Sequence, residues 1–113
     1  QDLTQEEEDH LTKLGWSLKE NWHPNGEKWY EHHSLHEKYH GKQEGWYKNG
    51  QKSFEQHCFH GSLHGKHEEW YSNGQKEVEA HFHHEMKHGV IKKWNRDGDL
   101  LVDEEYYYGN RIK

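Results

Sequence analysis

The sequence predicts an all-β protein: a single-layer antiparallel meander of four 24-residue β-hairpin repeats, preceded by a short N-terminal helix. Tryptophan recurs at intervals of 24 residues, at Trp22, Trp46, Trp70 and Trp94. An Asn-Gly or Asp-Gly step follows each of these Trp after two residues, and β-forming residues flank each step. Because Asn-Gly between two strands is a strong hairpin signal, each repeat is predicted to form strand, turn and strand.

The chain divides into an acidic cap segment and a repeat domain. The cap segment covers residues 1–14 and the hairpin repeat domain covers residues 15–113. In the cap, Thr4 and Glu7 have the spacing of a capping box, and Leu11 and Leu14 have helical spacing. This pattern predicts a short acidic helix that caps the first strand, with a disordered acidic tail as the alternative.

The chemistry of the turn favours a loop of three residues over one of two. A two-residue turn would make Pro24 a paired strand residue, and proline has no backbone N–H to donate. A type I turn closed by a left-handed glycine instead puts Pro24 at a position that proline prefers. The structural glycines of this turn are then Gly26, Gly50, Gly74 and Gly98.

The predicted loop also decides which side chains share a face, since side chains alternate along a strand. One face is expected to carry the four Trp with Tyr30, Phe54, Val78, Val102, Ser34, Cys58, Phe82 and Tyr106. The other face is expected to carry Tyr47, Tyr71, Glu31, Glu55, Glu79, Asp103, His33, His57 and His81. We expect the structural Trp stripe to pack along the curved sheet, although such a stripe could also meet a partner.

Composition and charge exclude several classes of partner. Only 28% of the residues are hydrophobic, but six Trp, seven Tyr and three Phe can order the chain if their rings are regularly placed. The formal charge of −6 argues against nucleic acid and anionic membranes as partners, and no apolar run is long enough for a membrane span. The lone Cys58 and the lack of a signal-peptide pattern predict a cytoplasmic protein.

Residues 59–75, "FHGSLHGKHEEWYSNGQ", resemble the MORN repeat in its bacterial form. The shared pattern is an aromatic residue, Gly-x-x-His-Gly, an aromatic pair and Asn-Gly. It returns in residues 82–99 with Glu85 in place of the first Gly, and the resemblance covers residues 16–109. Many bacterial proteins of this kind are labelled as antitoxins of the YwqK-like family, and eukaryotic MORN proteins are usually scaffolds or interaction modules. The resemblance implies a fold and an interaction role, and no catalytic residue.

Histidine is the most abundant candidate ligand, with 14 residues, nine of them at three repeat positions. Equivalent positions in successive hairpins lie roughly 10 Å apart, too far for one metal ion. Only pairs such as His60 and His64 could then cooperate, and we predict no metal site. His40, His64 and His88, the last of the three positions, are expected to be loop residues that pack at the sheet margin, and the others to be half-exposed strand residues. We predict a packing role for Cys58, and no catalytic residue.

The sequence therefore predicts a non-enzymatic protein-binding repeat module without a cofactor, whose partner presents a basic or mixed-charge surface. The favoured role is a small bacterial or phage-borne neutraliser, an antitoxin or inhibitor of a toxin or defence effector. The alternatives are a structural scaffold or spacer in a larger assembly and, further down, a lipid- or metal-binding module. The expected partner contacts are Tyr47, Tyr71, Glu55, Glu79, His57 and His81, in the middle of the array.

Overall fold

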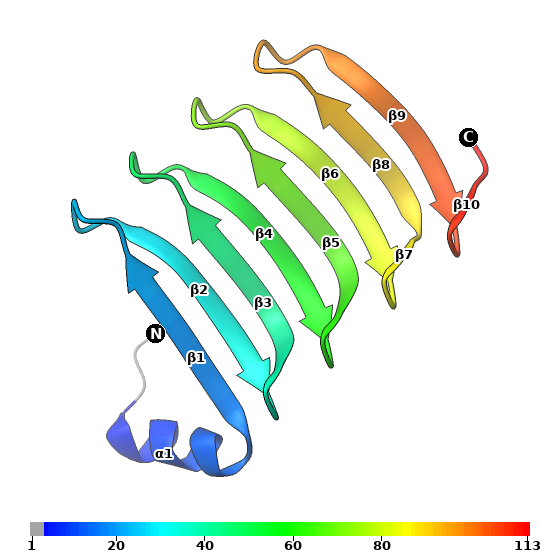
Figure 1. Cartoon of the computed structure of the whole chain (residues 1–113). Helices are drawn as coiled ribbons and strands as arrows, with labels where there is room; N and C mark the ends of the chain where they lie inside the picture. The colour runs from blue at the N-terminus through cyan, green and yellow to red at the C-terminus, as the bar shows by residue number, and fades with distance from the viewer. Residues whose placement is uncertain (1–3) are drawn as a thin grey trace.

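A computed structural model describes residues 4–113 and confirms the predicted fold class: an open antiparallel meander with one short N-terminal helix (Figure 1). In the ten-stranded sheet each strand is hydrogen-bonded to the next strand in the chain, except that the seventh and eighth strands both pair with the sixth. The elements are α1 (Gln5–Lys13), β1 (Trp16–Trp22), β2 (Lys28–Leu35), β3 (Lys38–Trp46), β4 (Lys52–Phe59), β5 (Ser62–Trp70), β6 (Lys76–His83), β7 (Met86–Lys87), β8 (Gly89–Trp94), β9 (Leu100–Tyr107) and β10 (Asn110–Arg111).

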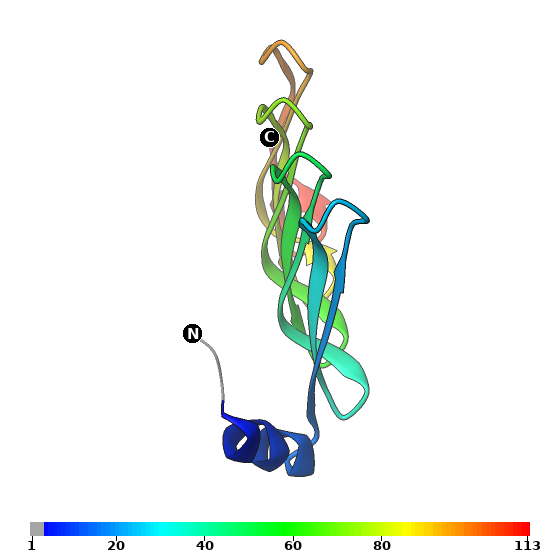
Figure 2. The same cartoon turned by 90° about the vertical axis from the view of Figure 1, so that its left-hand side faces the viewer.

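The sheet forms a single curved layer. Viewed edge-on it is thin, with no second layer of strands or helices against it (Figure 2). The principal extents of the molecule are 49 × 36 × 19 Å and its radius of gyration is 16.3 Å. A compact domain of about 100 residues has a radius of gyration near 13 Å. Most side chains therefore lie on one of two open faces and not in an enclosed core.

The predicted N-terminal helix is confirmed, and its first turn has the expected cap. The Thr4 hydroxyl accepts a hydrogen bond from the Glu7 amide, and the Glu7 carboxylate accepts one from the Thr4 amide. No described side chain of α1 is buried. The helix lies outside the sheet and leads into the start of β1 (Figure 1). Residues 1–3 of the predicted cap segment lie outside the described residues.

The Asn-Gly turns have the predicted three-residue loop. The Tyr47 amide donates to the Gln51 carbonyl, and the Gly50 amide donates to the Tyr47 carbonyl, which closes a type I turn. Gly50 has a φ of 85°, in the left-handed region where glycine is favoured. The other three turns repeat this arrangement, and Pro24 occupies the first central position of its turn, as predicted.

A second irregularity behind each turn makes the predicted face assignment wrong. Trp46 is opposite Lys52, but the preceding residue, Gly45, is opposite Phe54. One residue of β4, Ser53, therefore has no partner on β3. The same one-residue bulge recurs in every repeat, at Trp29, Ser53, Glu77 and Leu101. An extra residue reverses the alternation of side chains beyond it, so Phe54 lies on the face opposite Trp46.

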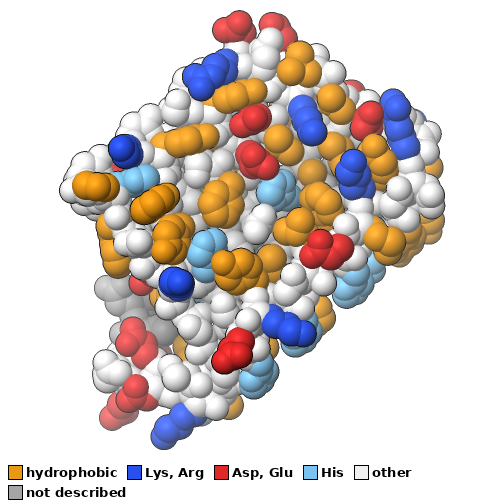
Figure 3. Space-filling view, in the orientation of Figure 1, with side chains coloured by type: hydrophobic (Ala, Val, Ile, Leu, Met, Phe, Trp, Pro, Cys, Tyr) orange, Lys and Arg blue, Asp and Glu red, His pale blue; other side chains and the backbone are white. Residues whose placement is uncertain are grey.

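The two faces consequently differ from those expected. The face that carries Trp46 also carries Glu44, Lys52 and Glu55, and we call it, with the equivalent residues of the other repeats, the ion-pair face. The opposite face we call the apolar face. It carries the three buried hydrophobic side chains of the described residues, Cys58, Ala80 and Ile91, and the fully buried Gln43. Figure 3 shows one side of the sheet, where hydrophobic side chains gather over the strands with histidines among them.

The turns at the other end of the strands have two residues, both with positive φ. His60 and Gly61, with φ values of 47° and 88°, connect Phe59 to its partner Ser62. This is the geometry of a type I′ turn, which suits the twist of the strands. His36 and His84 hold the same position with φ values of 49° and 46°. The prediction that these histidines are strand residues is therefore wrong. The prediction that His40 and His64 are loop residues is wrong as well, because they lie in β3 and β5.

Side chains beside the Asn-Gly turns bind each repeat to the next. The Asn49 side chain accepts from the Gln51 amide within its own turn and donates to the Ser72 carbonyl, at 2.8 Å, in the next. Asn25 and Asn73 make the same pair of bonds in their repeats. The Tyr47 hydroxyl likewise donates to the Trp70 carbonyl at 2.6 Å. These bonds connect neighbouring turns directly and supplement the strand ladder.

We predict that Gly45→Ala lowers the free energy of unfolding by about 1–3 kcal/mol, because it overpacks the apolar face. A Cβ atom on Gly45 would lie 2.2 Å from the Phe54 ring, so the ring or the strand must move. Thermal or urea unfolding measures the effect. The variant Gly45→Ala with Phe54→Leu provides the control and should recover part of the loss. Wild-type stability in Gly45→Ala would contradict the packing of Phe54 over Gly45.

Candidate protein-binding surfaces

The six residues predicted as partner contacts lie on two faces, so the prediction that they share one surface is wrong. Glu55 is paired with Glu44 on the ion-pair face, and His57 lies two residues further along the same strand. Tyr47 follows Trp46 directly and therefore points to the apolar face. Glu79 and His81 repeat the placement of Glu55 and His57, and Tyr71 repeats that of Tyr47. Whether each contacts a partner stays a prediction.

Tyr47 and Tyr71 are half-buried and serve the junctions between repeats. Their hydroxyls donate to the carbonyls of Trp70 and Trp94, at 2.6 and 2.9 Å. Desolvation raises the pKa of Tyr47, and the nearby Glu77 carboxylate adds to the effect. The Arg96 guanidinium lies over the Tyr71 ring, 5.4 Å from its centroid. These rings therefore have a structural role that the sequence interpretation did not include.

The ion-pair face is a ladder in which each lysine bridges two carboxylates from neighbouring strands. Lys52 lies 2.6 Å from Glu44 and 2.7 Å from Glu55, and Lys76 holds Glu68 and Glu79 at 2.6 and 2.9 Å. Like charges directly opposite on a sheet are destabilising, and the shared lysine offsets this repulsion. Glu44, although charged, is only 8% exposed. Much of the acidic charge of this face is therefore already paired within the molecule.

The two predicted histidines of the ion-pair face have different neighbours. The imidazole of His57 lies 3.4 Å from Glu55, while that of His81 contacts the Val90 carbonyl at 2.9 Å. The hydrogen bond from Lys52 lowers the pKa of Glu55, and the hydrogen bond from Lys76 lowers the pKa of Glu79. Both carboxylates are thereby held in the charged form that the ladder requires.

An open groove lies beside the Asn-Gly turns of the first three repeats. Its lining consists of His23, Trp29, Trp46, Tyr47, Lys48, Asn49, Ser53 and Ser72. Trp29 is 47% exposed and stacks on His23 at a centroid distance of 5.2 Å. The groove therefore combines large rings with a lysine and short polar side chains, a mixture typical of binding hot spots.

Trp29 is a candidate contact that the sequence interpretation missed. It occupies the bulge position, where the other repeats have Ser53, Glu77 and Leu101. Because the other hairpins form with Ser, Glu or Leu at this position, the hairpin does not require an aromatic ring there. The signal was present in the sequence as a Trp outside the 24-residue Trp series, but its exposure depends on the bulge.

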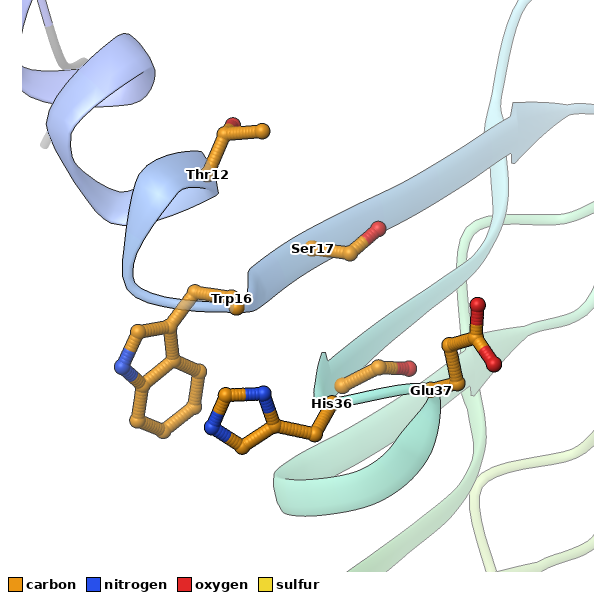
Figure 4. A pocket seen from close by; sticks show the side chains of 7 residues that line it. Thr12, Trp16, Ser17, His36 and Glu37 are labelled. Carbon is orange, nitrogen blue, oxygen red and sulfur yellow. The ribbon is translucent and has the colours of Figure 1, made fainter.

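A second hollow lies where α1 leads into β1 (Figure 4). Thr12, Ser17 and Glu37 line it together with the rings of Trp16 and His36, which lie side by side. Gly15 comes so close to the His36 ring that an added Cβ atom would lie 2.4 Å from it. This hollow is open, and it offers the hydroxyls of Thr12 and Ser17, the Glu37 carboxylate and the His36 imidazole without an arranged catalytic set.

Several chemical roles can be compared with the geometry of residues 4–113. Within that range no group of three or more His, Cys, Asp or Glu side chains is arranged to hold a metal ion. Cys58 is buried on the apolar face, and desolvation raises the pKa of its thiol, which keeps it a weak nucleophile. The helix that the structure describes is neither long nor apolar enough to cross a membrane.

We predict that the ladder loses stability in acid. The pKa values of Glu55 and Glu79 in the folded protein lie below the ordinary value of 4.5, so the stability that they contribute is present above that pH and is lost as the pH falls below it through the folded-state pKa values. Since these pairs are partly solvated, we expect at most about 1 kcal/mol from each carboxylate. Thermal melts across this range should show the loss, and Glu55→Gln with Glu79→Gln should flatten it. An unchanged acid slope in that variant would contradict the assignment.

Comparison with known proteins identified no relative: no family model, curated protein or solved structure matches the chain. The resemblance to MORN repeats therefore stays a prediction. What can be concluded about function depends on the sheet, its two faces and the groove beside the Asn-Gly turns.

Proposed function

We propose that this protein is a non-enzymatic module that binds another protein through its open sheet. The observation that carries the proposal is the lack of a covering layer. Among the described residues only three hydrophobic side chains are buried, while Trp22, Trp29, Phe59 and Tyr107 are each close to half exposed. Exposed aromatic groups on a rigid scaffold are characteristic of protein-binding surfaces.

The groove beside the Asn-Gly turns is the proposed centre of the contact. It spans three successive turns, and hydrogen bonds from Asn and Tyr side chains connect these turns to one another. The rings that line the groove are therefore held in a preorganised arrangement. Preorganised aromatic side chains lose little conformational entropy on binding. Trp29 is the proposed anchor, with the Tyr47 ring and Lys48 beside it.

The proposed role is that of a small neutraliser, which occupies the surface of a toxin or defence effector. The formal charge of −6 favours association with a basic or mixed-charge partner. Because lysines already pair many carboxylates of the ion-pair face, we expect this charge to steer association more than to provide affinity. The similarity to bacterial MORN repeats labelled as antitoxins supports the same role.

A scaffold in a larger assembly is the second candidate, and the outer edge of β1 favours it. This strand has a neighbour on one side only, and Leu18 and Trp22 on it are 49% and 52% exposed. An unpaired edge strand with exposed apolar side chains is a template for strand addition. Assembly through this edge would give oligomers whose size increases with concentration.

Purified protein with an affinity tag tests the two roles. A partner recovered from host extract, purified and mixed with the protein should form a one-to-one complex by size-exclusion chromatography with light scattering. Inhibition of that partner's activity would support the neutraliser. Concentration-dependent oligomers of the protein alone, without a stoichiometric partner, would support the scaffold and contradict the neutraliser.

We predict that Trp29→Ala weakens partner binding by about 1–3 kcal/mol and leaves the melting temperature nearly unchanged, because the ring is a contact and not part of the core. Leu101→Ala is the matched control. Leu101 occupies the same bulge position in the fourth repeat, is 64% exposed and lies outside the groove. Titration calorimetry should show a loss for Trp29→Ala alone. Equal affinity in both variants would remove the groove from the contact.

We predict the opposite pattern for Tyr47→Phe. This change keeps the ring in the groove but removes the hydrogen bond to the Trp70 carbonyl. Stability should fall by about 0.5–1.5 kcal/mol while affinity is retained. Urea unfolding and calorimetry on the same samples measure both quantities. A loss of affinity with unchanged stability would instead make the hydroxyl a direct partner contact.

A further inference from the structure

The edge of the sheet that carries the type I′ turns has a repeated contact between histidines and turn amides. Nδ1 of His40 accepts a hydrogen bond from the His60 amide at 3.0 Å. Nδ1 of His64 accepts from the His84 amide at 3.4 Å, and Nδ1 of His88 accepts from the Tyr108 amide at 3.0 Å. Each bond joins the start of one strand to the turn of the following hairpin. We call these three bonds the turn-edge latch.

The latch requires a neutral imidazole. An imidazole nitrogen can accept a hydrogen bond only when it carries no proton, and in the protonated ring both nitrogens are donors. The amides of His60, His84 and Tyr108 belong to the first residue of a two-residue turn, where no cross-strand carbonyl faces them. Protonation of the ring therefore removes the acceptor and brings two N–H groups together.

The first repeat shows what replaces the latch where histidine is absent. Trp16 occupies the position equivalent to His40, and its indole nitrogen can only donate. There the turn amide, from His36, donates to the Gly15 carbonyl at 2.7 Å. A backbone carbonyl does not titrate in the physiological range. The bond from the first turn amide is consequently insensitive to pH, whereas in the later three junctions the equivalent amide depends on a histidine and the next amide of the turn donates to a backbone carbonyl.

The latch lies beside a cluster of imidazoles in which neighbouring rings disfavour protonation of His83. The His83 ring centroid lies 4.9 Å from that of His64 and 4.6 Å from that of His84. Desolvation lowers the pKa of His83, and the neighbouring rings of His84, His64 and His88 lower it further. A histidine with a lowered pKa in the folded state favours unfolding or opening as the pH falls below about 6.5.

Two of the four charged groups on the turns around the latch are already engaged in other contacts. The turn residues and their flanks carry two carboxylates and two ammonium groups, on Glu37, Glu85, Lys38 and Lys87. The Glu85 carboxylate already accepts a hydrogen bond from the Leu63 amide at 2.9 Å, and Lys87 lies over the Tyr106 ring. The rings of Phe59, Tyr107 and Tyr108 also contact the imidazoles.

We propose that the turn edge is a proton-operated latch: it joins the last three hairpins while the imidazoles of His40, His64 and His88 are neutral, and it opens when these rings are protonated. The inference goes beyond partner binding, since it requires no partner. Opening frees the His60, His84 and Tyr108 amides, whereas the neighbouring amides of Gly61, Glu85 and Gly109 keep their backbone carbonyl partners. The Asn-Gly turns contain no bond to a histidine of the latch and stay closed.

Another set of histidines in the same chain responds to protons in the opposite direction. His33 and His57, on the ion-pair face, lie 3.1 and 3.4 Å from Glu31 and Glu55. Protonation strengthens these contacts because it creates ion pairs. The chain therefore contains a matched control, with histidines of similar exposure whose protonation removes no hydrogen-bond acceptor.

Thermal melts at pH 7.5 and pH 5.0 test the latch above the range where carboxylates titrate. The test variant carries His40→Asn, His64→Asn and His88→Asn, which supply a side-chain oxygen as an acceptor that does not titrate. Between pH 7.5 and pH 5.0 we expect its melting temperature to fall by at most half as much as that of the wild type. The melting temperature of the control variant, His33→Asn with His57→Asn, should fall by at least as much as that of the wild type. An equal fall in the test variant and the wild type would overturn the proposal.

Hydrogen exchange of the wild-type protein provides a second test that does not depend on the folding of any variant. After correction for intrinsic rates, protection of the His60, His84 and Tyr108 amides should drop at least tenfold between pH 7.5 and 5.0. The Gly50 and Gly74 amides, which donate to backbone carbonyls, should keep their protection. A uniform change in both groups, or no change in either, would overturn the latch.

Discussion

The one-residue bulge behind each Asn-Gly turn is the constraint on which the rest of the structure depends. It reverses the alternation of side chains between the turn and the body of the hairpin. As a result each Trp shares a face with lysines and glutamates, and the hydrophobic residues of the second strand gather on the opposite face. Phe54 can then cover Gly45, and Lys52 can reach both Glu44 and Glu55. Without the bulge, rings and charges would be distributed as the alternation alone predicts.

Contacts between repeats replace much of what a buried core provides in a two-layer domain. Each hairpin binds the next through the strand ladder, through Asn and Tyr side chains at one end and through histidines at the other. Individual hydrogen bonds of this kind contribute only about 0.5–1.5 kcal/mol, but they recur in phase along the array. Stability in such an array is close to a sum of nearest-neighbour terms. Local openings at one edge are therefore compatible with an intact sheet.

The fourth repeat interrupts several of these series. Asn95 replaces the bridging Tyr, Asp97 replaces the Asn that donates to the next turn, and Leu100 replaces the central Lys of the ladder. A carboxylate cannot donate a hydrogen bond, so the chain of side-chain donors stops at this repeat. Terminal units of repeat proteins commonly differ from the internal units in this way. β10 then folds back and pairs with part of β9.

Local chemistry alone was sufficient to predict the hairpins, the capped helix and the three-residue loop. Pro24, the Asn-Gly steps and the pair Thr4 and Glu7 act through their immediate neighbours, so the sequence determined these features. The tertiary structure decided the rest, because it depends on pairing between strands. The bulge at Ser53, the placement of Tyr47 away from Glu55, the exposure of Trp29 and the hydrogen bond from His60 to His40 all require a known register between strands. A register shift of one residue moves a side chain to the other face, and no local pattern in this chain shows where the extra residue is inserted.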